Sequence, residues 1–104
     1  MFIMAEHKLV RISFDDILYI EGLKDYVRFY LEDGSKMMSL ISLKTVEGYL
    51  PYPEFLRVHR SYIVHSPKIK QVDRLRLFID DIQIPISETY RDEVLNYFDL
   101  HTLT

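Results

Sequence analysis

The sequence contains no cysteine and only three glycines among its 104 residues. The absence of cysteine excludes disulfides, thiolate nucleophiles and thiolate metal sites together. Because the glycines are not grouped, no glycine-rich loop is present that would hold a phosphate. No apolar run approaches the roughly 18 residues that cross a bilayer, and the N-terminus lacks the features of a signal peptide. We therefore expect a cytoplasmic protein with no membrane contact.

The length and composition predict one globular domain, since 104 residues can bury a single core and 48% of them are apolar. The formal net charge of −3 argues against a uniformly basic nucleic-acid-binding surface. The charge is uneven, however, with net values of −2 over residues 1–50, +4 over 51–78 and −5 over 79–104. An anion can therefore bind the middle third of an otherwise acidic chain.

Alternating apolar and polar residues predict short strands along most of the chain. Strands are expected at 8–14, 17–22, 26–32, 36–41, 55–65, near 69–72, 74–79 and 82–87. The EDGS stretch at 32–35 is a hairpin signal, and Pro85 is suited only to an edge or terminal strand position. Helical spacing predicts two short helices. One covers 42–50 with Ser42 as its N-cap, and the other covers 88–98 with Ser87 as its N-cap.

Catalytic and metal-binding patterns are absent from the sequence. No HxH, HExxH or GxSxG motif occurs, and in a continuous strand His59 and His65 would lie roughly 20 Å apart. Ser61 near His59 has no acid at a supporting spacing, and the Asp15-Asp16 and Asp80-Asp81 pairs are typical of turns. We therefore expect no enzyme activity, no catalytic residue, no metal site and no cofactor.

The stretch FLRVHRSYIVH, residues 55–65, interrupts an apolar pattern with a polar cluster. In a regular strand Arg60 would share a face with the apolar residues 56, 58, 62 and 64. Either Arg60 reaches solvent along Tyr62, or the strand bulges at 59–61 so that His59 also reaches solvent. Such a cluster either blocks unwanted pairing at a sheet edge or presents donors to a phosphate or a base. Periodicity alone leaves both interpretations open.

The same stretch resembles the hallmark of the LytTR DNA-binding domain, the output module of many bacterial two-component response regulators. Three other segments resemble the family in the same order: DDILYIEGLKDYVRFYLEDG at 15–34, MSLISLKTVEGYLP at 38–51 and IPISETYRDEVL at 84–95. The resemblance implies a mostly β fold, an elongated stack of small antiparallel sheets with two short helices. It also implies sequence-specific binding of double-stranded DNA, with loops entering successive major grooves of imperfect direct repeats.

The resemblance implies a DNA face built from three loops. Its expected DNA-binding residues are Lys24, Asp25, Tyr26, Arg28, His59, Arg60, Ser61, Ser87, Thr89, Tyr90 and Arg91. Two residues depart from the family pattern. Glu88 stands where a basic residue is common, and its carboxylate would repel phosphate; His65 stands where asparagine commonly follows the VHRSYIV motif.

The expected partners follow from the resemblance as well. Residues 1–104 would be the C-terminal part of a response regulator whose receiver domain is phosphorylated through a sensor histidine kinase. The isolated domain would be monomeric and would dimerise on DNA. Two other functions stay open from the residues: a protein-interaction module that uses exposed strand edges or the face of Tyr26 and Tyr30, and RNA binding by stacked tyrosines.

Overall fold

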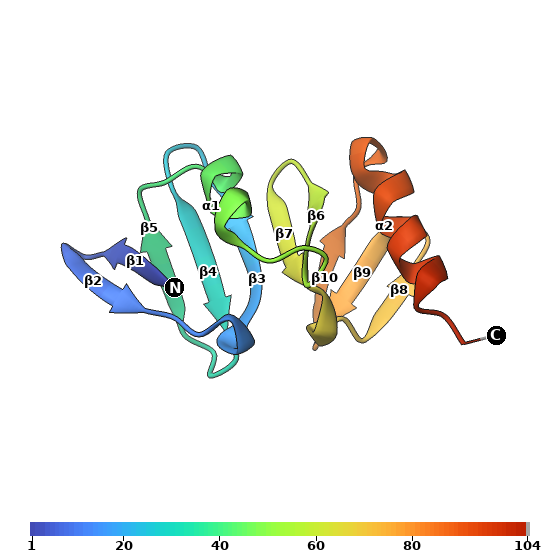
Figure 1. Ribbon diagram of the computed structural model, residues 1–104, viewed down its shortest axis with the longest axis horizontal. Helices are drawn as coiled ribbons and strands as arrows, with labels where there is room; N and C mark the ends of the chain where they lie inside the picture. Colours follow the sequence, from blue (N-terminus) through green and yellow to red (C-terminus); the bar gives the residue numbers. More distant parts are fainter. Residues whose placement is uncertain (104) are drawn as a thin grey trace.

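The computed structural model describes residues 1–103 and contains three antiparallel sheets side by side in an elongated molecule of 47 × 26 × 23 Å (Figure 1). The two-stranded sheet pairs β1 (Phe2–Ala5) with β2 (Lys8–Arg11). The five-stranded sheet has the order β5-β4-β3-β7-β6, and the three-stranded sheet has the order β10-β9-β8. This architecture confirms the predicted stack of small sheets with two helices.

The strands of the five-stranded sheet are β3 (Ile17–Gly22), β4 (Val27–Leu31), β5 (Lys36–Ser39), β6 (Phe55–His59) and β7 (Tyr62–His65). The three-stranded sheet consists of β8 (Gln71–Asp73), β9 (Arg76–Ile79) and β10 (Ile82–Pro85). The two helices are α1 (Leu43–Tyr49) and α2 (Glu88–Leu100), and two short 3-10 turns are η1 (Phe14–Asp16) and η2 (Ser66–Lys68).

Local sequence signals account for most of these boundaries. Ser42 caps α1, because its Oγ accepts a hydrogen bond of 3.1 Å from the Thr45 N–H. Pro85 lies in β10, an edge strand, where its missing N–H is tolerated. Ser87 occupies the predicted N-cap position of α2, but its side chain makes no capping hydrogen bond.

One expectation from periodicity was wrong, and one strand was not predicted. The stretch 55–65 is a hairpin of β6 and β7 with an irregularity in pairing between Arg57 and His59, so it is not one continuous strand. Strand β1 was not predicted, because FIMA is apolar throughout and shows no alternation. Its burial nevertheless alternates: Phe2 and Met4 are exposed, whereas Ile3 and Ala5 are buried against the five-stranded sheet.

The five-stranded sheet is buried on both faces, which produces two hydrophobic clusters. Phe29 and Ile63 belong to the cluster that the β1–β2 hairpin and α1 cover. Val58, Val64 and Leu77 belong to the cluster beneath the three-stranded sheet and α2. The central sheet therefore joins the two halves of the molecule. Among residues 1–103, no helix is long and apolar enough to span a membrane.

Leu75 and Leu77 form a matched pair for testing the second cluster, because Leu77 is fully buried whereas Leu75 is 41% exposed. We expect Leu77→Ala to lower the free energy of unfolding by about 2–5 kcal/mol through lost contacts and a residual cavity. Leu75→Ala should change it by less than about 1 kcal/mol. Urea unfolding of both variants measures the difference, and equal losses would show that Leu77 is not part of a packed core.

Candidate nucleic-acid interface

Three segments that are distant in sequence lie at one edge of the molecule, the upper edge in Figure 1: the β3–β4 turn, the β6–β7 turn and the start of α2. We call residues 23–26, 60–61 and 87–91 the loop edge. The Gly22 N–H donates to the Ser61 carbonyl at 2.7 Å, and the Ser87 N–H donates to the Val58 carbonyl at 2.9 Å. Both neighbouring segments are thus hydrogen-bonded to the β6–β7 hairpin.

The conformation of the β6–β7 turn depends on Arg57, which was not among the predicted site residues. Its guanidinium donates to the carbonyls of His59 at 2.8 Å and Arg60 at 2.6 Å. The same group forms an ion pair of 2.7 Å with Glu47 of α1 and lies 5.5 Å from the ring centre of Tyr90. Arg57 therefore positions the turn and connects it to both helices. Strand periodicity could not reveal this role, because the contacts come from the folded turn and from α1.

Three cations of the loop edge are exposed: Lys24, Arg60 and Arg91. None of them takes part in an ion pair among residues 1–103, in contrast to Arg57. The β3–β4 turn, the β6–β7 turn and residues 40–43 line a hollow, and its charged lining residues are Lys24, Asp25 and Arg60. Long, unpaired cationic side chains beside a hollow can bind phosphate groups without first breaking an ion pair.

The remaining predicted residues of the loop edge differ in their availability. Asp25 and Thr89 are exposed, whereas Ser61, Tyr26 and Tyr90 are partly buried. Ser87 Oγ is buried without a hydrogen-bond partner within the described part of the chain. Its hydroxyl is therefore less accessible than the resemblance implied. Glu88 is exposed beside it at the start of α2 and adds negative charge there.

Arg28 differs from the other predicted cations, because it is already engaged on the face of the five-stranded sheet. Its guanidinium donates to Tyr30 Oη at 3.2 Å and lies 3.5 Å from a Glu21 carboxylate oxygen. Glu21 also accepts hydrogen bonds from the hydroxyls of Tyr30 at 2.7 Å and Tyr62 at 3.3 Å. Burial, followed by the nearby Tyr30 and Glu21, raises the pKa of the neighbouring Tyr19. Arg28 thus belongs to a tyrosine network rather than to the free cations of the loop edge.

His59 contributes to the turn through its imidazole. Nδ1 accepts a hydrogen bond of 3.0 Å from the Ser61 N–H, so a neutral ring carries its proton on Nε2. Burial lowers the pKa of His59, and the positive charges of Arg60 and Arg57 lower it further. The neutral form therefore supports the turn and leaves Nε2–H as a donor.

The lowered pKa of His59 predicts a dependence of stability on pH. An unfolded histidine has a pKa of about 6.5, so this contribution to stability is present above that pH. It is lost as the pH falls through the lower pKa of the folded state, because protonation of Nδ1 breaks the bond to Ser61. NMR titration of His59 should give a midpoint below that of the urea-unfolded chain. His59→Asn, which keeps an acceptor, should lose less stability on acidification; an equal loss would contradict this account.

Comparison with known proteins identifies the family and agrees with the fold. The family model of the LytTr DNA-binding domain matches residues 7–99. The sensory transduction protein LytT of Bacillus subtilis (strain 168) is 29% identical over 86% of this chain, and the match spans 43% of LytT, less than half of its length. The fold matches the LytTr DNA-binding domain of a protein described as a methyl-accepting/DNA response regulator from Bacillus cereus, with a TM-score of 0.79, 22% identity and 94% coverage of both chains. Since the family model covers nearly all of the chain, this protein belongs to the LytTR family of DNA-binding domains.

Proposed function

We propose that this domain binds double-stranded DNA at specific promoter sequences and thereby controls transcription, as the output part of a response regulator. Membership of a family of DNA-binding domains supports the first step. The similarity to LytT, a sensory transduction protein, supports the second. The domain needs no catalytic group for this role, because its output is occupancy of a site on DNA.

The observation that carries the proposal is the loop edge itself. Two backbone hydrogen bonds, from Gly22 to Ser61 and from Ser87 to Val58, join the three segments that contain the free cations. Cations from separate loops on one edge can follow a DNA backbone and neutralise several phosphates at once. The loop edge contains three cations and two carboxylates, so its net charge is +1 in a chain whose net charge is −3.

The residues of the loop edge, together with His59 and Arg28 beside it, have different proposed roles. Lys24 and Arg91 contact phosphates, and Arg60 at the tip of the hairpin contacts either a phosphate or a guanine edge. The Nε2–H of His59 and the hydroxyls of Ser61 and Thr89 donate to the backbone and set the register. Arg28, held by Glu21 and Tyr30, supports the sheet behind the turn instead of contacting DNA.

Two copies on one DNA molecule would compensate for modest affinity. The carboxylates of Asp25 and Glu88 lie exposed beside the three cations, which reduces the attraction between one domain and DNA. We therefore propose binding to imperfect direct repeats in successive major grooves, with a monomer in free solution and a dimer on DNA. A receiver domain in the longer protein, phosphorylated through a sensor histidine kinase, would bring the two copies together. We propose that the protein carries out this role in the cytoplasm.

A protein-interaction role is the second candidate, because the N-terminal sheet exposes apolar side chains. Phe2, Met4 and Leu9 are each more than half exposed, and they belong to β1 and β2 rather than to the loop edge. Contact with another protein through this sheet leaves the loop edge free. The two functions are therefore separable by substitution at one surface without change at the other.

Arg60→Ala should weaken binding to a repeat-containing promoter fragment by about tenfold without changing the thermal unfolding midpoint, since the side chain is exposed. Arg11→Ala is the matched control, because Arg11 is exposed at the end of β2, outside the loop edge. Fluorescence anisotropy at several salt concentrations measures both variants. If Arg60 contacts a phosphate, the slope of log affinity against log salt concentration should fall by about one unit on every DNA sequence. If Arg60 contacts a base, the variant should lose discrimination at one base pair of the site. Unchanged binding, or unfolding of the variant, would contradict the assignment of Arg60.

Glu88→Lys should strengthen DNA binding and make its salt dependence steeper, because a repulsive carboxylate becomes a cation at the start of α2. Glu93→Lys makes the same charge change farther along the exposed face of the helix. Anisotropy titrations should show a larger gain at position 88 than at position 93. Equal gains would mean that only net charge matters and that the start of α2 does not approach DNA.

A further inference from the structure

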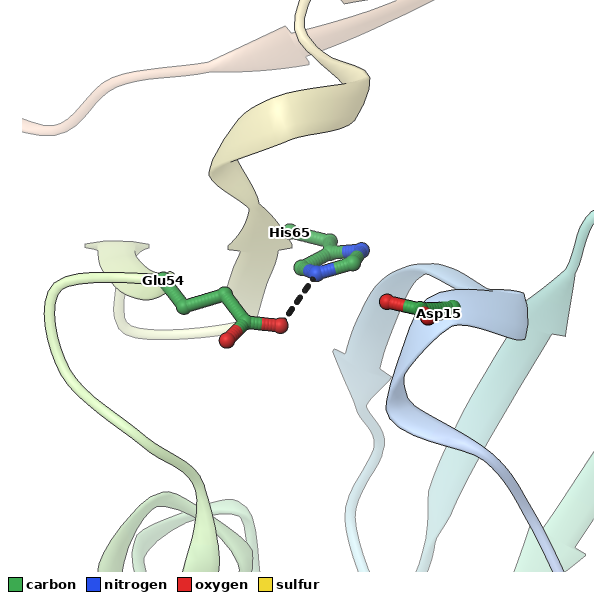
Figure 2. Close-up of side chains that lie close together, drawn as sticks. All are labelled: Asp15, Glu54 and His65. Atoms are coloured by element: carbon green, nitrogen blue, oxygen red, sulfur yellow. Dashed lines mark hydrogen bonds and ion pairs between the residues drawn. The ribbon is translucent and has the colours of Figure 1, made fainter.

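A second cluster of polar side chains lies on the side of the five-stranded sheet opposite the loop edge, at the other ends of its strands (Figure 1). It consists of Asp15 in η1, Glu54 in the loop before β6, and His65 at the end of β7. One carboxylate oxygen from each acid and one imidazole nitrogen of His65 all lie within 4.8 Å of one another. Figure 2 shows Asp15 and Glu54 turning their carboxylates toward the ring of His65. Local spacing could not reveal this cluster, because its members come from three segments.

His65 is held in a fixed orientation. Its side chain is almost fully buried, and its ring stacks on Phe55 with a centroid distance of 4.3 Å. Nδ1 lies 2.9 Å from the carbonyl oxygen of Ile17. Because a carbonyl can only accept, Nδ1 carries a proton and donates it. In the neutral ring the lone pair is then on Nε2, which lies 2.8 Å from a carboxylate oxygen of Glu54.

A cation among the three side chains would stabilise this arrangement. The 2.8 Å contact between Nε2 and Glu54 is a hydrogen bond when Nε2 also carries a proton. Asp15 takes part in no ion pair among residues 1–103, so its carboxylate adds a second negative charge to the cluster. A proton on Nε2 would satisfy Glu54 alone. A divalent ion would neutralise both carboxylates and use the nitrogen as its third ligand. An imidazole whose other nitrogen donates to a backbone carbonyl is also the usual arrangement of a metal-ligating histidine.

We propose that Asp15, Glu54 and His65 bind one divalent transition-metal ion, for which Zn²⁺ is the best match. The ligands are one oxygen of each carboxylate and Nε2 of His65, with water in the fourth position. The nitrogen ligand favours Zn²⁺ over Mg²⁺ and Ca²⁺, which prefer oxygen ligands alone. With a neutral imidazole, the two carboxylates balance the charge of the ion.

Binding requires only small movements of the side chains. In a tetrahedral zinc site with bonds of about 2.0–2.1 Å, ligand atoms lie about 3.3 Å apart. The contact of 2.8 Å between His65 and Glu54 must therefore lengthen slightly, while the oxygen of Asp15 approaches. Asp15 is exposed and Glu54 is partly exposed, so both can adjust around the buried histidine. The ion would then join η1 to β7 and to the loop before β6, and its effect would be on the stability of the fold.

Zinc binding to the metal-free domain tests the proposal directly. After removal of metal with a chelator, titration calorimetry with Zn²⁺ should show one equivalent bound, and the thermal unfolding midpoint should rise with zinc concentration. Co²⁺ in place of Zn²⁺ should give the visible absorption of a four-coordinate site. Glu54→Gln and Asp15→Asn should each weaken zinc binding at least tenfold. Asp16→Asn is the matched control, because Asp16 is the neighbouring exposed acid in η1 outside the cluster.

Two outcomes would overturn the proposal. In the first, zinc binding is absent or is unchanged in Glu54→Gln and Asp15→Asn, which would assign any bound ion to other surface groups. In the second, nitrogen NMR shows that Nε2 of His65 stays protonated in the presence of zinc, so that the proton alone serves as the cation. Both variants change side chains that are at least partly exposed, so neither result depends on a disrupted core.

Discussion

The attachment of two neighbouring segments to the β6–β7 hairpin is the constraint on which the arrangement of the loop edge depends. The hairpin supplies the carbonyls of Ser61 and Val58, and the segments around Gly22 and Ser87 donate to them. Arg57 in turn holds the carbonyls of His59 and Arg60. Since the same turn carries Arg60, the backbone position of Arg60 is determined by the packed hairpin and these hydrogen bonds.

Burial on both faces of the central sheet makes this attachment rigid. Phe55 and Ile63 of the hairpin pack toward the N-terminal half, while Leu56, Val58 and Val64 pack toward the three-stranded sheet and α2. A hairpin between two cores cannot tilt without opening one of them. The elongated shape follows from the same feature, because each smaller sheet covers one face of the larger one. The loop edge with its exposed cations and the cluster around His65 therefore lie at opposite ends of the strands of this sheet.

Sequence patterns predicted the elements whose signals are local. The bounds 17–22 of β3 were predicted without error, and α1 begins directly after the predicted cap Ser42. Strand β1 was missed because four consecutive apolar residues carry no period. The β6–β7 turn was first interpreted as part of a strand, because HRS contains none of the glycine, asparagine or aspartate residues that usually mark a hairpin. Side-chain hydrogen bonds from Arg57 hold this turn instead, and the periodicity of the sequence does not reveal them.

The sequence by itself determined the family, the mostly β fold and the positive middle third that contains Arg60, since these depend on residue identity and order. Only the tertiary structure decided which charges are free and which are paired. Arg28 and Arg60 are both arginines near predicted loops, yet Arg28 is held by Glu21 and Tyr30, whereas Arg60 is exposed and unpaired among the described residues. In the same way, the fold alone brings Asp15 and Glu54 to His65. The physical reason is that strand pairing and burial bring together side chains from distant segments, and those neighbours determine what each charged group can bind.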